Sequence, residues 1–128
     1  MTVIATWDNE GHESLRYIHY GRWTWEEVDE AVAEAQDMLR GNRRQIHVII
    51  DLRESASIED GDPAREKRAL SIAPGRETEV IFVGARAQSR TYYAVMRHRY
   101  KGRRTKEHFH FTHDLDEARQ LLPVPAYV

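Results

Sequence analysis

Apolar and polar residues alternate most regularly near the start of the chain. Residues 3–7 form a run that favours a strand, and residues 8–11 have the composition of a tight turn. Residues 15–20 then alternate between two faces, which is typical of a second strand. The pattern predicts a β-hairpin. On its second strand, one face carries Leu15, Tyr17 and His19, and the other face carries Arg16, Ile18 and Tyr20.

Over residues 24–39 the apolar residues recur with the spacing of a helix. Thr24 and Glu27 have the spacing of a capping box, in which each side chain bonds a backbone N–H at the helix start. Gly41 suits the end of the helix. Carboxylates occupy the face opposite the apolar one. The apolar stripe consists of Val28, Ala31, Val32, Ala35, Met38 and Leu39.

Three later segments read as strands. Residues 46–52 are almost continuously apolar, as in a buried central strand, although His47 interrupts them. A polar loop from Arg53 to Asp62 follows. Residues 80–83 predict the fourth strand and residues 107–111 the fifth.

Helical segments separate these strands. We expect helices at 63–72 and 88–100, the first opened by Pro63, and a last helix capped by Asp114 with help from Glu117. The buried stripe of that last helix is expected to be Leu115, Ala118, Leu121 and Leu122.

This order predicts one α/β domain over residues 1–128. The hairpin is followed by helix and strand three times and then by a last helix, so the sheet is mixed and has five strands with helices packed on it. Helices between consecutive strands imply parallel, right-handed crossovers. The hairpin then supplies the antiparallel edge.

Composition narrows the class of protein. A hydrophobic content of 41% with three Trp favours a folded domain, and the absence of Cys excludes disulfides and thiolate chemistry. The sequence has no signal-peptide pattern and no apolar run of the roughly 20 residues that a membrane helix needs. We therefore expect a cytoplasmic protein.

Charge is unevenly distributed along the chain. Residues 1–39 carry nine acidic and two basic residues, whereas residues 80–106 carry eight basic residues and no acidic one. The simpler interpretation is two solvated faces of opposite sign. The alternative is a polarised surface that attracts an anionic partner or pairs subunits head to tail.

The succession of elements resembles the STAS domain, the fold of bacterial anti-sigma factor antagonists and of the cytosolic tails of sulphate transporters. The resemblance rests on the strand ending Asp51-Leu52, on the loop containing residues 58–61, and on the last strand and helix at 109–122. In anti-sigma antagonists the loop after the third strand carries a serine that a partner kinase phosphorylates. Asp60 stands at that position here, so the resemblance implies that this phosphoserine is absent, permanently mimicked, or replaced by Ser55 or Ser57.

The open edge of a parallel sheet, beyond the carboxyl ends of its strands, is where ligands usually bind. Here that edge collects Asp51, Arg53 and Ser55 from one loop, and Arg86 and Arg90 from another. Two Arg beside a helix start, which Ser89 is placed to cap, form a candidate anion site. The alternative is that Asp51 pairs with Arg86 or Arg90 and fixes the loops.

A basic segment at 97–106 raises the possibility of nucleic-acid or membrane binding. Its arginines are interleaved with aromatic residues that can stack on bases. Basic residues at a helix end also complement the helix dipole without any ligand. The arginines of this patch are Arg97, Arg99, Arg103 and Arg104.

His108, His110 and His113 have a spacing compatible with a zinc or nickel site. We favour a solvated sheet face or an edge for His108 and His110, and expect no metal or other cofactor. Recognised catalytic signatures are missing: there is no nucleophile elbow, glycine-rich phosphate loop or metalloprotease motif.

The sequence therefore predicts a non-catalytic interaction or regulatory module that forms a homodimer. Its partner is expected to be a protein, of the anti-sigma type if the resemblance holds. The alternative is a sensor of small anions or nucleotides that uses Arg86 and Arg90, and nucleic-acid binding through the basic segment is a third hypothesis.

Overall fold

The computed structural model describes residues 2–41, 46–57, 77–84, 90 and 109–122. Within these ranges the chain forms six strands and two helices. In chain order the elements are β1 (Thr2–Trp7), β2 (Ser14–Arg22), α1 (Trp25–Met38), β3 (Ile46–Asp51), β4 (Ser55–Ser57), β5 (Glu77–Val83), β6 (Phe109–Thr112) and α4 (Leu115–Gln120).

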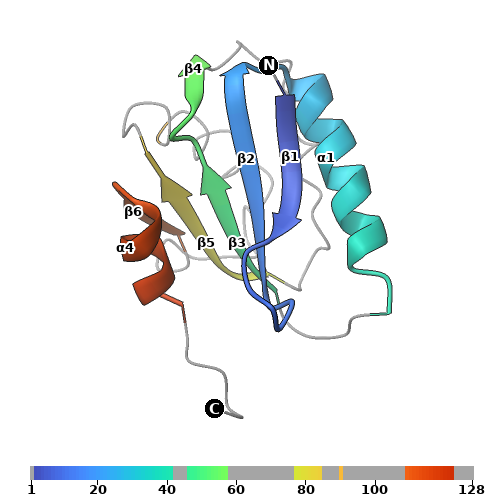
Figure 1. Cartoon of the computed structure of the whole chain (residues 1–128), viewed down its shortest axis with the longest axis vertical. Coiled ribbons are helices and arrows are strands. Elements are labelled where there is room, and N and C mark those ends of the chain that lie inside the picture. The colour runs from blue at the N-terminus through green and yellow to red at the C-terminus, as the bar shows by residue number, and fades with distance from the viewer. Residues whose placement is uncertain (1, 42–45, 58–76, 85–89, 91–108, 123–128) are drawn as a thin grey trace, which may run out of the picture.

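The sheet has the order β1-β2-β3-β5-β6 (Figure 1). β1 pairs antiparallel with β2, while β2, β3, β5 and β6 are parallel to one another. The α/β class, the mixed sheet and the antiparallel hairpin at its edge are thus confirmed. Because the four parallel strands point the same way, their carboxyl ends meet at one edge of the sheet.

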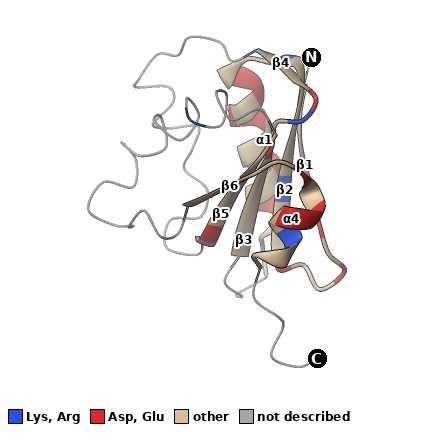
Figure 2. Cartoon of the chain, turned by 90° about the vertical axis from the view of Figure 1, so that its left-hand side faces the viewer, with Lys and Arg blue, Asp and Glu red and all other residues tan. Residues whose placement is uncertain are grey.

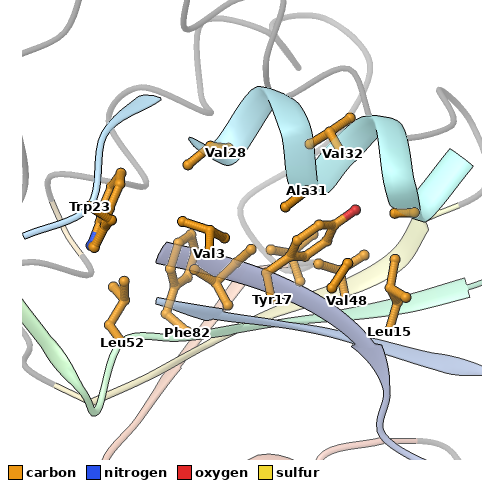
Figure 3. Packing of buried hydrophobic residues seen from close by; sticks show 14 of the residues in the cluster. Val3, Leu15, Tyr17, Trp23, Val28, Ala31, Val32, Val48, Leu52 and Phe82 are labelled. Carbon is orange, nitrogen blue, oxygen red and sulfur yellow. The ribbon is translucent and has the colours of Figure 1, made fainter. Parts of the chain in front are cut away.

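The main core lies between the sheet and α1. Leu15 and Tyr17 of β2 are almost completely buried on this face, and the alternation expected for β2 is confirmed by its burial pattern. Val3 of β1 packs beneath Val28 and Ala31 of α1 (Figure 3). Val48 and Ile50 of β3 and Phe82 of β5 belong to the same cluster, because alternate residues of a strand point to the same face.

On the second face the described residues form a smaller cluster. Ile49, Ile81 and Val83 of the sheet pack against Leu115 and Ala118 of α4. The stripe expected for this helix was wrong at one position, because Leu121 is 44% exposed. α4 ends at Gln120 and Leu121 is its C-cap. The side chain of Leu121 is therefore not part of the buried face of the helix.

α1 begins as its sequence predicts. The Thr24 side chain accepts a hydrogen bond from the backbone N–H of Glu27, and Glu27 accepts one in return from the backbone N–H of Thr24. The helix ends with Leu39 as its C-cap, and Gly41 has a φ of +82°, which glycine adopts without strain.

The loop expected from Arg53 to Asp62 was partly wrong. Its residues Ser55–Ser57 form β4, which pairs in parallel with the end of β2. The strand expected at residues 80–83 is β5, and it begins earlier than expected, at Glu77. The helices expected at 63–72 and 88–100 lie outside the described residues, apart from helical Arg90.

We predict that Thr24→Ala lowers the free energy of unfolding by about 1 kcal/mol, because it removes the hydroxyl that accepts from Glu27. Urea denaturation followed by circular dichroism measures the change. Thr24→Ser, which keeps the hydroxyl, is the matched control and is expected to retain most of this stability. Equal losses in both variants would contradict the capping role.

Candidate functional site

Asp51 is the most constrained polar residue at the carboxyl edge of the sheet. It ends β3, and its side chain is only 1% exposed. Arg53 binds it as a fork, with Nε donating to Oδ1 at 2.9 Å and an Nη atom donating to Oδ2 at 2.8 Å. The backbone N–H of Arg53 adds a bond of 3.2 Å to Oδ1, and Arg16 donates to Oδ2 at 3.2 Å. A buried carboxylate is therefore held by two guanidinium groups.

These contacts decide the ionisation of Asp51. Burial alone would raise the pKa of its carboxyl, but the hydrogen bonds and charge of Arg53, together with Arg16, outweigh burial and hold the pKa below its ordinary value of 3.8. The same pairing raises the pKa of Arg53. Asp51 is consequently a fixed anion rather than a proton carrier at neutral pH.

The ion pairs continue across the α4 face of the sheet. Nε of Arg16 lies 3.3 Å from the Asp8 carboxylate, whose side chain is 3% exposed. Arg119 of α4 donates two bonds to Asp8, at 3.0 and 2.9 Å. Five charged residues thus alternate in sign from the loop after β3 to α4. This ionic network consists of Arg53, Asp51, Arg16, Asp8 and Arg119.

Backbone geometry brings the loops after β3 and β5 together. Gly84 has a φ of +118°, and a Cβ built on it would lie 3.0 Å from the backbone N of Arg53 and from the carbonyl carbon of Leu52. Leu52 donates to the Val83 carbonyl oxygen at 2.8 Å, and Gly84 donates to that of Thr112 at 3.1 Å. Only glycine fits this approach, so the edge is closely packed at this point.

Ser55 is anchored from the other side. Nε1 of Trp23 donates to its Oγ at 2.9 Å, and the backbone N–H of Gly21 donates to the carbonyl oxygen of Glu54 at 2.9 Å. The Glu54 side chain itself is exposed. The loop after β3 is therefore fixed by its backbone and by Ser55 while it presents Glu54 to solvent.

His19 lies buried beneath this loop. Its Nδ1 is 3.0 Å from the carbonyl oxygen of Tyr17 and 3.3 Å from that of Asp51, so Nδ1 carries the proton and donates to them. Burial lowers the pKa of His19 to about 4, although these bonds and the charge of Asp51 oppose the shift. The ring also packs edge-on against Trp23, with centroids 4.8 Å apart. A neutral histidine in this setting supports the strand end.

The expected site is assembled in part. The structure brings Asp51, Arg53 and Ser55 together, and it places the Ser57 backbone in β4. Arg90 is exposed, and among the described residues Asp51 pairs with Arg16 and Arg53 rather than with Arg90. The predicted pairing of Asp51 with Arg86 or Arg90 is therefore not made by Arg90, and Arg86 lies outside the described residues. The other expected site residues lie outside the described ranges: Asp60, Arg86, Ser89, Arg97, Arg99, Arg103 and Arg104.

The histidine cluster divides in the structure. Nε2 of His110 lies 2.7 Å from a carboxylate oxygen of Glu79 on the neighbouring strand, whereas His113 is exposed and its backbone N–H donates to Glu117. His108 is outside the described part. No three ligating side chains converge among the residues that the structure describes.

Sequence reasoning missed Arg16, Asp8 and Arg119. Arg16 was placed on the correct face of β2, but nothing local indicates that it reaches Asp51, 35 residues away. Arg119 and Asp8 are 111 residues apart. The available signal was Arg16 on the partly buried face of β2, between buried Leu15 and Tyr17.

Comparison with protein-family models, curated proteins and solved structures found no match. In the described part of the chain, no helix is long and apolar enough to cross a membrane.

We predict that Asp51→Asn lowers the free energy of unfolding by about 3 kcal/mol, because two guanidinium groups lose their buried counter-charge. Asp37→Asn is the control, since Asp37 is 72% exposed and pairs only with exposed Arg40 in the described region. It should change stability by about 0.5 kcal/mol or less. Chemical denaturation at pH 7 measures both variants.

The Asp51 effect has a defined pH window. A carboxyl whose folded pKa is depressed stabilises the fold above its unfolded pKa and loses that contribution as the pH falls through the folded value. The difference between wild type and Asp51→Asn should therefore be constant at neutral pH and shrink below pH 3.8. A difference that stays constant into strong acid would contradict the buried ion pair.

We predict a separate pH dependence from His19. The unfolded chain binds its proton near pH 6.5 and the folded chain only near pH 4, so stability falls as pH decreases between these values. The loss is on the order of 3 kcal/mol for a shift of this size. Denaturation between pH 4 and 7 should show a shallower slope for His19→Gln, and the imidazole NMR signals of His19 should not titrate above pH 5. Titration near pH 6.5 in the folded protein would contradict the buried neutral ring.

Proposed function

We propose that this protein is a non-catalytic, STAS-like interaction module that binds a protein partner. The proposed contact surface is the loop and strand at residues 53–57, together with Arg90. The observation that carries the proposal is the fixed presentation of Glu54, whose backbone is bonded to Gly21 while its side chain is exposed. A loop held in one conformation loses little entropy when a partner binds.

The chemistry of the neighbouring groups supports binding rather than catalysis. Asp51 is held as an anion by two arginines, His19 is buried in the neutral form, and Ser55 accepts from Trp23. General acid–base catalysis requires a group that reaches the substrate and whose pKa lies near the operating pH. These three residues instead stabilise the loop.

The resemblance to anti-sigma factor antagonists makes a regulatory protein the proposed partner class. Asp60, at the position of the family's phosphoserine, carries a permanent charge, so we propose that a serine kinase does not control binding at that position. Regulation would then depend on the amount of partner present.

A sensor of small anions is the competing function. Its guanidinium donors would be Arg86 and Arg90, because the fork of Arg53 is occupied by Asp51. Exposed Arg90 is available for such a role. Titration with phosphate, sulphate and nucleotides at millimolar concentration distinguishes the two functions, since binding that is lost in Arg90→Ala would favour the sensor.

We predict that Glu54→Arg weakens partner binding at least about tenfold, because it reverses a charge at the centre of the proposed surface. A photo-crosslinking amino acid at position 54 first captures the partner from the source cell, and calorimetry with the purified partner then measures affinity. Glu10→Arg is the matched control, with the same charge change at an exposed site in the turn after β1.

The two variants together decide the proposal. Loss of affinity in Glu54→Arg alone supports the surface at residues 53–57. Unchanged affinity in both variants would mean that the partner binds elsewhere. An equal loss in both would mean that affinity responds only to the net charge of the protein.

A further inference from the structure

β1 lies at the end of the sheet order and, among the described strands, is hydrogen-bonded only to β2. Natural edge strands usually carry lysine, proline or a bulge that blocks pairing with another chain. β1 has none of these: its sequence TVIATW contains no charged residue and no proline, and its register with β2 is uninterrupted from Thr2 to Trp7. Its composition favours strand pairing.

One face of this edge presents an exposed isoleucine between Thr2 and Thr6. α4 packs against β3 and β5 through Ile49, Ile81 and Val83, and the β1 side of the sheet carries an exposed Ile4, at 42%. Ile4 lies opposite half-buried Ile18 in the register of the hairpin. A strand added to β1 would find apolar side chains beside it on this face.

The opposite face is bordered by a helix of one charge sign. α1 packs on β1 through Val28 and Ala31, which contact the cluster containing Val3 (Figure 3). All charged residues within α1 are carboxylates, and none is lysine or arginine (Figure 2). They are Glu26, Glu27, Asp29, Glu30, Glu34 and Asp37. Within the described part of the chain, α1 therefore contributes only negative charge to the helix side of the edge.

We propose that the β1 edge binds an extended segment of a partner protein as an additional strand, with apolar side chains on the Ile4 face alternating with lysine or arginine on the α1 face. Backbone bonds give such complexes their affinity, and the alternate side chains give their specificity. A second copy of this chain fits less well, because antiparallel pairing of two β1 strands places two acidic helices on one face. This surface is distinct from residues 53–57 and does not depend on the function proposed for them.

A peptide of about eight residues that alternates isoleucine and lysine is long enough to span β1 and serves as the probe. Added to the isotope-labelled full chain, it should shift the amide NMR signals of residues 2–7 and protect them from hydrogen exchange. A peptide with glutamate in place of lysine should bind at least about tenfold more weakly because it faces the carboxylates of α1.

Ile4→Lys should weaken binding of the lysine peptide at least about tenfold, because it replaces the apolar side chain that contacts the peptide's isoleucines with a charge and blocks the edge. Leu121→Lys is the matched control, since Leu121 is exposed to a similar degree, 44% against 42%, and lies after α4. Reversing two α1 charges with Glu30→Lys and Glu34→Lys should also weaken binding.

Three results would overturn the proposal. The first is a lysine peptide that leaves the signals of residues 2–7 unchanged, and the second is equal binding of both peptides. The third is a wild-type dimer whose β1 amides are already protected without peptide, because the occupant would then be a second copy. None of these outcomes bears on the affinity change measured with Glu54→Arg, so the two proposals fail separately.

Discussion

A buried carboxylate, that of Asp51, sets the arrangement of the sheet edge. At 1% exposure it is stable only if positive groups replace the water that it has lost, and Arg53 and Arg16 do so. Arg53 belongs to the loop after β3 and Arg16 to β2, so one carboxylate fixes a loop against two strands. The start of the loop is therefore held by this charge, and the rest of residues 53–57 by Trp23 and the backbone of β2.

The ionic network lies on the α4 face of the sheet, where the described residues form a smaller apolar cluster than on the α1 face. The α1 face buries Trp23, Trp25, Tyr17 and Phe82 in a large cluster, whereas α4 has six residues and contributes only Leu115 and Ala118 to full burial. A helix this short gains little stability on its own. The two bonds from Arg119 to nearly buried Asp8 act together with the packing of Leu115 and Ala118 to hold α4 on the sheet.

Local sequence patterns predicted the features that depend on residues close together in the chain. The alternation on β2 and the capping box of Thr24 and Glu27 involve neighbours along the chain, and both were confirmed. β4 escaped prediction because its three residues are held by backbone pairing with Gly21 and Arg22, which leaves no periodic pattern. Within the site, Asp51 and Arg53 were foreseen. Arg16 was not, because residues distant in sequence become its partners only after the sheet has formed.

β2 connects the two proposed binding surfaces. Residues 15–20 pair with β1 along one side and residues 14–18 with β3 along the other, while Gly21 and Arg22 pair with β4. A strand bonded on both sides does not slide in register without exposing buried Leu15 and Tyr17. The β1 edge and residues 53–57 are therefore held at a constant separation. A partner that binds both surfaces would gain affinity from this fixed spacing, without a conformational change.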